Sequence, residues 1–161
     1  EEYLRGLAAR KVPLYGVCFG HQLLAQTFGG KVEKCPVGWE LGTTEVELNQ
    51  LGQTDPLFQN LPPQFTVQQS HADVVTQLPE GAEILASNAH WGIQALRLGE
   101  RIWGTQFHPE FTPETMAAAV ERVTGMWEAE ASVRQQFLET IRPTPNAPAC
   151  LANFAQIVTA G

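Results

Sequence analysis

A single cysteine lies where a catalytic nucleophile could be held. Cys18 is the centre of Gly16-Val17-Cys18-Phe19-Gly20, which follows an apolar run at 12–17 and precedes apolar residues at helical spacing over 19–28. A strand, a sharp Gly-x-Cys-x-Gly turn and a helix form a nucleophile elbow, here with sulfur in place of a serine oxygen. We expect glycines beside the cysteine because a Cβ there would collide with neighbouring backbone. The thiol would then lie at a helix N-terminus, where free N–H groups and the helix dipole favour the thiolate.

A cysteine nucleophile requires a base that is held by a third group. The best candidate is His108, in Gln106-Phe107-His108-Pro109-Glu110, where a predicted strand runs into a turn. Glu110 can fold back towards the imidazole, fix its tautomer and stabilise the imidazolium, and Pro109 stiffens the turn between them. Cys18, His108 and Glu110 therefore form a candidate catalytic triad for a cysteine enzyme.

Each of these residues also has a purely structural interpretation. Cys18 alone could be a small buried hydrophobe, and His108 alone could be a structural histidine at a strand end; their combination favours catalysis. Cys35 and Cys150 do not lie on an elbow, and we interpret both as structural. His21 is a rival base, but it follows Cys18 on the first turn of the same helix and points away, so we assign it a role in packing or in starting the helix.

Other polar motifs are less specific. His90-Trp91 is interpreted as part of a turn between strands, with a partner-facing or acceptor-pocket role as the alternative. Gly29-Gly30 is predicted to end the helix rather than to bind phosphate. The sequence contains no Walker motif and no dinucleotide-binding fingerprint.

Composition limits the function classes. The 161 residues include 10 Lys and Arg against 17 Asp and Glu, a formal net charge of −7, which argues against a nucleic-acid partner or an anionic membrane surface. A hydrophobic content of 43% supports a single globular core. Three cysteines make neither a disulfide framework nor a metal-ligand pattern. No apolar stretch approaches the length of a membrane span, and a working thiol suits a reducing cytoplasmic location.

The rest of the chain alternates short strands and helices. We predict strands at 31–34, 43–48, 65–69, 84–87, 93–98 and 101–107. We predict helices at 114–123, 125–140 and 151–159, the end of a helix at 1–10 and a helical turn at 55–58. Gly99-Glu100 is a plausible hairpin turn, while Thr112 and Pro113 are expected to begin the helix that follows them.

These motifs together resemble the class I (triad-type) glutamine amidotransferase family. The resemblance rests on Gly-Val-Cys-Phe-Gly-His-Gln at 16–22 and Gln-Phe-His-Pro-Glu at 106–110. Ser70-His71-Ala72-Asp73 and the 38–42 loop resemble the GMP-synthetase-like branch. The similarity extends over about 12–123.

The resemblance implies a role for each matching residue. Cys18 would attack the side-chain carboxamide of glutamine and form a γ-glutamyl thioester. His108 would act as base and then protonate the departing ammonia, and Glu110 would orient it. The backbone N–H of Phe19 would supply one oxyanion donor, and Gln22 would contact the substrate.

Substrate recognition is expected from one further segment. Ser70, His71 and Asp73 would hold the α-amino and α-carboxylate groups of glutamine, with His71 either contacting the substrate or shaping the pocket. The chemistry requires neither a metal nor an organic cofactor, and ammonia would pass to a synthase subunit or to another acceptor. We expect no nucleic-acid or membrane partner.

The resemblance also implies a fold and a missing part. The expected fold is an α/β three-layer αβα sandwich with a central, mostly parallel sheet, similar to the flavodoxin-like class I amidotransferase fold. The family has a glycine-rich oxyanion loop before the nucleophile strand, and nothing upstream of Cys18 can be that loop. We therefore expect an N-terminally truncated chain without its first strands, with a partial catalytic domain at 1–124 and a helical extension at 125–161 packed on it.

Two alternatives to glutamine hydrolysis remain open. A γ-glutamyl hydrolase or peptidase would use the same triad and thioester on a different leaving group. A catalytically silent interaction module would keep the fold without a complete oxyanion hole. The intact triad argues against the silent module for the parent protein, whereas for a truncated chain without the upstream loop the silent module stays open.

Overall fold

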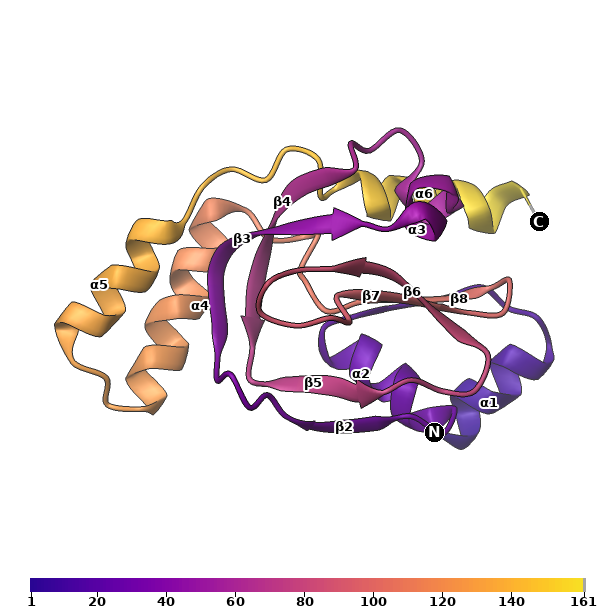
Figure 1. The fold of residues 1–161 in the computed structure, drawn as a ribbon, viewed down its shortest axis with the longest axis horizontal. Coiled ribbons are helices and arrows are strands. Elements are labelled where there is room, and N and C mark those ends of the chain that lie inside the picture. The colour runs from indigo at the N-terminus through magenta and orange to yellow at the C-terminus, as the bar shows by residue number, and fades with distance from the viewer. Residues whose placement is uncertain (161) are drawn as a thin grey trace.

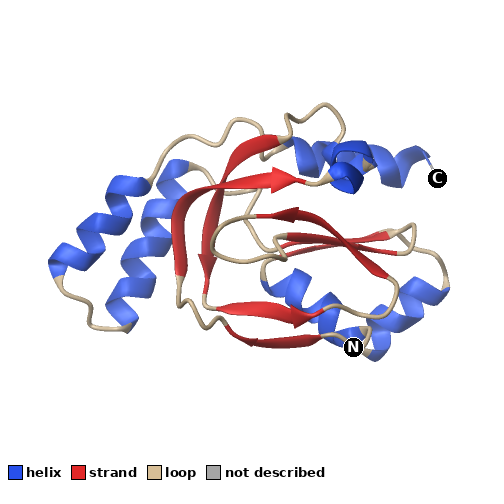
Figure 2. Cartoon of the chain, in the orientation of Figure 1, coloured by secondary structure: helices blue, strands red, loops and turns tan. Residues whose placement is uncertain are grey.

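The computed structural model describes residues 1–160, and its centre is a curled mixed sheet (Figures 1 and 2). Within those residues the six strands of this sheet lie in the order β1 (Leu14–Val17), β8 (Ile102–Thr105), β7 (Ala95–Leu98), β6 (Ala82–Ser87), β3 (Glu40–Leu48) and β4 (Gln64–His71). The α/β class expected from the sequence is confirmed.

The pairing of β1 with β8 brings the candidate nucleophile and base together. The two strands are parallel, with Gly16 opposite Gly104 and Val17 opposite Thr105. Parallel strands have their carboxyl ends at the same edge of a sheet. Cys18, which follows β1, and the segment 106–108, which follows β8, therefore lie side by side although some 90 residues separate them in the chain.

The rest of the sheet departs from the mostly parallel arrangement expected above. Each of the other pairings described for this sheet is antiparallel. The cause is local, because short connections join β6 to β7 and β7 to β8, whereas a parallel pair requires a long crossover. A hairpin joins β7 to β8 as predicted, but its turn has three residues, 99–101, instead of the expected two, with Leu98 paired to Ile102.

A second, two-stranded sheet flanks the site. It consists of β2 (Lys31–Lys34) and β5 (Asp73–Gln77), which are antiparallel with Lys34 opposite Asp73. The sequence patterns did not predict β5. It begins immediately after β4, so that the chain turns at Ala72 from the large sheet into the small one.

Helices cover the sheet from several sides (Figure 1). α1 (Glu2–Ala9) packs on α2 (Phe19–Thr27), which contacts β1, β8 and the small sheet. α4 (Pro113–Met126) and α5 (Ala131–Thr140) pack together against the β3–β4 hairpin. On the opposite side from α2, α6 (Ala149–Ala160) contacts η1 (Pro56–Phe58), and the short α3 (Gln50–Thr54) lies nearby against β6.

The ends of two helices follow the expected local rules, and one prediction fails. Thr112 caps α4 through its side chain, with Pro113 in the first turn, and Gly29 has a φ of 98° just beyond α2. The continuous helix predicted at 125–140 is instead broken after Met126, where Glu128 adopts a φ of 52°. The break lets Trp127 pack against Trp39, with ring centroids 4.7 Å apart.

The largest core cluster lies between the sheet and α6. Its fully buried side chains include Val67, Leu85, Trp103 and Phe107. Phe107 stands between the two residues that follow β8, Gln106 and His108, and anchors that segment in the core. This packing fixes the backbone from which the His108 side chain projects.

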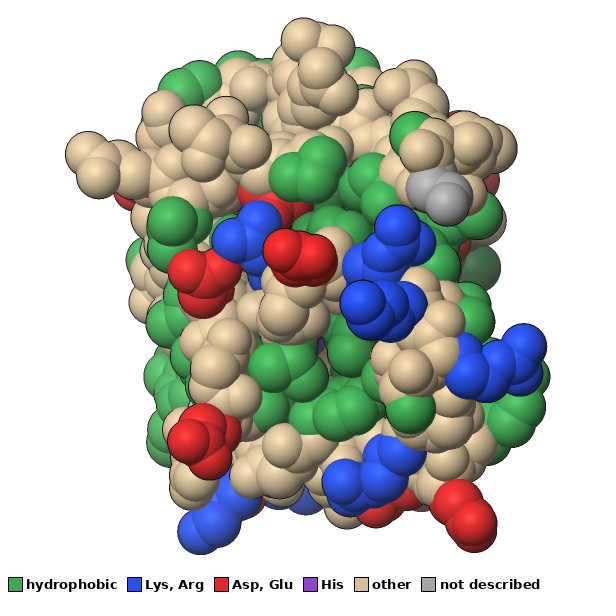
Figure 3. Space-filling view, turned by 90° about the vertical axis from the view of Figure 1, so that its right-hand side faces the viewer, with side chains coloured by type: hydrophobic (Ala, Val, Ile, Leu, Met, Phe, Trp, Pro, Cys, Tyr) green, Lys and Arg blue, Asp and Glu red, His purple; other side chains and the backbone are tan. Residues whose placement is uncertain are grey.

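One end of the molecule carries an apolar hollow that is separate from the nucleophile. Val12, Leu98 and Ile102 line it together with Lys11 and Arg101, and its volume is about 330 Å³. Figure 3 shows this end, with hydrophobic side chains in the centre and charged side chains of both signs around them. None of the helices in residues 1–160 is both long and apolar enough to span a membrane.

Candidate active site

Cys18 occupies a strained turn between β1 and α2. Its φ is 50° and its ψ is −104°, a conformation that costs a non-glycine residue about 1–3 kcal/mol. Its backbone N–H donates to the Thr105 carbonyl at 2.8 Å, which continues the β1–β8 ladder into the turn. The chain then enters α2 at Phe19, whose N–H is among the free donors of the first helical turn.

The two glycines beside Cys18 have different roles. A Cβ on Gly16 would lie 2.7 Å from the backbone nitrogen of His21 and closer still to the Gly20 carbonyl group. Helix α2 can therefore approach β1 this closely only because residue 16 is a glycine. The expectation that a Cβ beside Cys18 would collide with neighbouring backbone is therefore confirmed for Gly16. It is wrong for Gly20, where an added Cβ would meet nothing within 4 Å because that position faces open space.

The imidazole of His108 is held on both sides. Its Nδ1 lies 2.7 Å from Glu110 Oε1, and its ring stacks on Phe111 with centroids 4.0 Å apart. Its backbone N–H donates to the Gln68 carbonyl at 2.8 Å, which ties the segment to β4. The side chain of His108 is 14% exposed and that of Glu110 is 43% exposed.

The charge of His108 depends on its two neighbours. Burial alone would lower the pKa of this imidazole, but hydrogen bonds and charge interactions with the neighbouring Cys18 and Glu110 raise the pKa to about 9. Opposite charges close to an ionisable group favour its charged form. The arrangement therefore favours the imidazolium form of His108 beside Cys18 and Glu110.

A small cleft opens beside the sulfur. Its volume is about 210 Å³, and its lining includes Cys18, Lys34, Trp39, Ser70 and Asp73. The Ser70 carbonyl lies 3.9 Å from Cys18 Sγ. Larger hollows lie elsewhere, including one of about 690 Å³ beside Glu40, but Cys18 lines the small cleft, so a substrate bound there would lie next to its sulfur.

Charges of both signs stand at the mouth of this cleft. Lys34 Nζ lies 3.8 Å from Asp73 Oδ1, and both side chains are at least half exposed. An exposed pair of this kind contributes little to stability. Its charges are therefore available to a zwitterionic ligand.

Two of the predicted substrate-binding side chains are engaged by the protein itself. Gln22 Nε2 donates to the Asp73 carbonyl at 2.7 Å and to Gln106 Oε1 at 3.2 Å. His71 is buried, with Nε2 3.0 Å from Glu40 Oε2 and Nδ1 3.2 Å from the Asp73 carbonyl. The side chain of His71 thus supports the pocket wall, which is one of the two roles considered for it.

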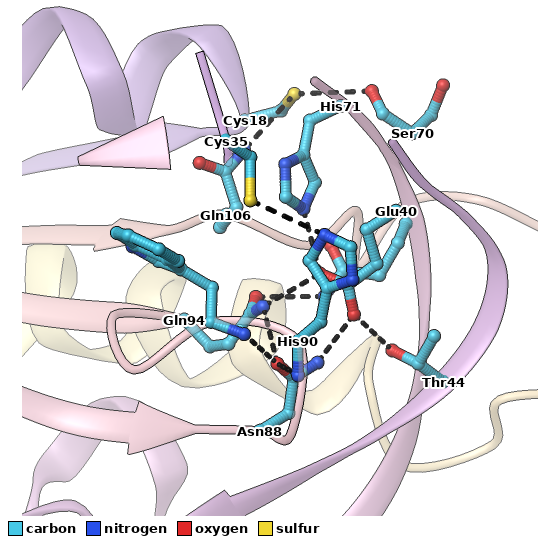
Figure 4. Close-up of polar contacts among 12 residues, drawn as sticks. Cys18, Cys35, Glu40, Thr44, Ser70, His71, Asn88, His90, Gln94 and Gln106 are labelled. Carbon is cyan, nitrogen blue, oxygen red and sulfur yellow. Dashed lines mark hydrogen bonds and ion pairs between the residues drawn. The ribbon is translucent and has the colours of Figure 1, made fainter. Parts of the chain in front are cut away.

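Glu40 is the buried anchor of that wall (Figure 4). Only 3% exposed, its carboxylate accepts hydrogen bonds from Asn88, Gln94, Thr44 and His71. Burial alone would raise the pKa of Glu40, but the hydrogen bond and charge of His71, with the other donors, lower it. The glutamate is therefore an ion in the interior.

The remaining cysteines and histidines do not join the triad. Cys35 and Cys150 are buried free thiols, and burial raises the pKa of Cys150 to about 12. His21 is fully buried in α2; its ring makes no hydrogen bond of good geometry, and burial lowers its pKa to about 3. His90 lies in the turn between β6 and β7, where its Nε2 is 3.6 Å from Cys35 Sγ.

Sequence reasoning missed three residues at the site. Lys34 and Trp39 line the cleft, and Gln106 donates to Cys18 Sγ at 3.7 Å. Lys34 reaches the site only through the pairing of β2 with β5, which no local pattern predicts. Gln106 belongs to the His108 motif, and that proximity is the signal that could have identified it. Within residues 1–160, no group of three or more His, Cys, Asp or Glu side chains is placed to hold a metal ion.

Comparison with known proteins gives the same protein class as the sequence motifs. The family model of glutamine amidotransferase class-I matches residues 1–124. The chain is 41% identical over 111 residues to one subunit of a glutamine-hydrolyzing GMP synthase from Archaeoglobus fulgidus, covering 68% of this chain and 57% of that protein. It is 45% identical over 101 residues to the glutamine-hydrolyzing GMP synthase of Porphyromonas gingivalis, covering 62% of this chain and 19% of that protein.

A solved structure shares the fold. The crystal structure of a glutamine amidotransferase from Thermotoga maritima superposes with a TM-score of 0.76 at 22% identity, covering 99% of this chain and 68% of that one. The protein belongs to the class I glutamine amidotransferase family. The chain spans 19% and 57% of the lengths of the two GMP synthase relatives named above.

Proposed function

We propose that this protein hydrolyses the side-chain amide of L-glutamine through a thioester on Cys18. One observation carries the proposal: a cysteine on a strained elbow interacts with a histidine whose Nδ1 is 2.7 Å from a carboxylate, in a chain of the class I glutamine amidotransferase family. A cysteine, a base and an orienting acid are the groups that acyl transfer requires.

The proposed reaction has two steps. The Cys18 thiolate attacks the amide carbon of glutamine, and the C–N bond breaks as the His108 imidazolium gives its proton to the leaving nitrogen, which departs as ammonia. Neutral His108 then takes a proton from water, whose oxygen attacks the thioester carbon. The C–S bond breaks, which releases glutamate and restores the thiolate. Glu110 keeps Nδ1 of the imidazole protonated and oriented throughout.

The oxyanion of each tetrahedral intermediate needs preorganised donors. We assign one to the Phe19 backbone N–H, because it follows the nucleophile and begins α2, where the helix dipole is positive. This is the usual geometry of an elbow.

The mouth of the cleft suits the other end of glutamine. An α-amino acid carries an ammonium and a carboxylate on one carbon, and Asp73 and Lys34 present the complementary pair 3.8 Å apart. We propose that Asp73 takes the ammonium and Lys34 the carboxylate, with Ser70 on the wall between them and the sulfur. Gln22 and His71 would act by shaping the pocket, because their amide and ring nitrogens already bind protein groups.

We propose that the ammonia serves a synthase partner. The support is the name of the Archaeoglobus relative, which is one subunit of a glutamine-hydrolyzing GMP synthase. The helices after residue 124 would belong to the same domain, because α5 packs on α4 and β3, and α6 packs on η1.

The test is release of glutamate and ammonia from glutamine by the 161-residue chain and by its Cys18→Ser and Glu110→Gln variants. The proposal predicts no turnover for Cys18→Ser and a large loss for Glu110→Gln, with far-ultraviolet circular dichroism unchanged. A γ-glutamyl anilide serves as a second substrate, because efficient cleavage of the anilide without glutamine hydrolysis would instead assign a γ-glutamyl peptidase. Glutamine turnover by Cys18→Ser would refute the nucleophile assignment.

A further inference from the structure

Gln106 is fully buried and its carboxamide faces the candidate nucleophile (Figure 4). Its Nε2 donates to Cys18 Sγ at 3.7 Å, and its Oε1 accepts from Gln22 Nε2 at 3.2 Å. A thiolate is an acceptor, so an amide N–H that faces it is a charge-assisted donor. A carboxamide turned the other way would present an oxygen to the sulfur and repel it. The orientation of this one amide therefore matters to the charge on Cys18.

The surrounding hydrogen bonds determine that orientation. Gln22 Nε2 donates to the Asp73 carbonyl at 2.7 Å, and a backbone carbonyl can only accept, so the nitrogen of Gln22 must face it. The second N–H of the same nitrogen is then directed at Gln106 Oε1. With its oxygen engaged, Gln106 has only its nitrogen to offer to Cys18.

The Asp73 carbonyl is itself held in place by the buried ring of His71, which also contacts Glu40. His71 Nδ1 lies 3.2 Å from that carbonyl, and His71 Nε2 lies 3.0 Å from Glu40 Oε2. Both ring nitrogens therefore face oxygen atoms, and the carboxylate of Glu40, only 3% exposed, holds the ring on the side away from Asp73. A continuous chain of contacts thus joins Glu40 to the sulfur of Cys18.

We propose that Gln106 is a positioning residue for the nucleophile, and that Gln22 fixes its direction. Gln106 would stabilise the Cys18 thiolate by donating to it, while the Glu40–His71 pair and the Asp73 carbonyl keep Gln22, and through it Gln106, from flipping. The role assigned to Gln106 rests on the proposed function, because it assumes that Cys18 reacts as a thiolate. It adds a residue that is neither part of the triad nor in the substrate pocket.

The test measures the thiolate directly and uses no glutamine. The rate of alkylation of Cys18 by iodoacetamide is followed by mass spectrometry from pH 5 to 10 in the wild-type chain and in Gln106→Met, Gln106→Glu and Gln22→Met. Loss of a hydrogen bond to a charged acceptor is expected to move the midpoint of the rate profile of Gln106→Met upward by about one pH unit. Gln106→Glu is expected to move it further, because a carboxylate would face the sulfur.

Gln22→Met tests whether Gln22 fixes the direction of the Gln106 amide. It also provides a second measurement if the Gln106 variants do not fold. It should shift the midpoint in the same direction by a smaller amount, and it should add nothing in the Gln106→Met background because both act through one amide. Asn153→Leu is the matched control: this buried amide on α6 donates to the Leu57 and Gln59 carbonyls, and its replacement should leave the midpoint unchanged.

The outcomes separate the two proposals. Unshifted midpoints in folded Gln106→Met and Gln22→Met would overturn the role of Gln106 and leave glutamine hydrolysis untouched. A shift as large in Asn153→Leu would also overturn it, because the effect would then reflect general loosening. Shifted midpoints in a chain that never hydrolyses glutamine would support the positioning role and refute the proposed substrate.

Discussion

The two glycines of the elbow offer a test of how closely α2 must approach β1. Alanine at position 16 would place its Cβ 2.7 Å from the His21 nitrogen and still closer to the Gly20 carbonyl group. These are backbone atoms, so the clash is relieved only if the start of α2 moves away from β1. Alanine at position 20 would meet nothing within 4 Å. Gly16→Ala and Gly20→Ala therefore make the same chemical change on either side of Cys18, with opposite expected effects on stability.

The magnitudes follow from the surroundings. Overpacking typically costs about 1–3 kcal/mol, and we expect Gly16→Ala at or above the upper end because no flexible side chain can yield. For a chain of this length that lowers Tm by about 6–12 °C. Gly20→Ala replaces a helical glycine in open space and should stabilise the protein by up to about 1 kcal/mol.

The assay is thermal unfolding of both variants, together with iodoacetamide labelling of Cys18 in the folded state. Gly16→Ala should also slow labelling, because displacement of α2 moves the sulfur away from His108. A Gly16→Ala variant as stable and as reactive as the wild type would refute the close approach of α2 to β1. A Gly20→Ala variant that unfolds as readily as Gly16→Ala would show that the clash is not what distinguishes the two positions.

Three further predictions concern charged groups. Burial lowers the pKa of His21 from 6.5 to about 3, so the wild type should lose up to about 5 kcal/mol of unfolding free energy as the pH falls from 6.5 to about 3. Urea unfolding of His21→Phe should show a smaller loss of unfolding free energy over the same pH range. The pKa of His108, raised to about 9, should fall in Glu110→Gln, and an NMR titration of the His108 ring that does not move would contradict the pairing. Lys34→Met should raise the KM for glutamine about tenfold with kcat nearly unchanged. Lys31→Met, on the same exposed strand, should change neither constant. Equal KM values in the two variants would show that Lys34 does not bind the substrate.

The local parts of the site were predictable because their signals are local. The elbow at Cys18 needs only a strand, a glycine turn and a helix within about a dozen residues, and the structure has all three there. The same holds for His108 and Glu110, which lie two residues apart and meet at 2.7 Å. Short-range sequence patterns determine such turns, so the residues could be named without the fold.

The predictions that failed concern features that depend on which strands pair. The mixed sheet follows from short connections among β6, β7 and β8, and nothing in the composition of those strands distinguishes parallel from antiparallel neighbours. Lys34 enters the cleft because β2 pairs with β5, a strand that was not predicted. The orientation of Gln106 depends on Gln22, which is 84 residues away in the chain. Long-range pairing of this kind leaves no periodic trace in a single sequence.

The most direct test of the central claim is intact-mass labelling of the chain with an electrophilic diazoketone analogue of glutamine. The account predicts one adduct, located on Cys18 by peptide mapping, whose formation is suppressed by free L-glutamine but not by D-glutamine and is absent in Cys18→Ser. Exclusive labelling of Cys35 or Cys150, or labelling of Cys18 that L-glutamine does not slow, would contradict a glutamine site at Cys18.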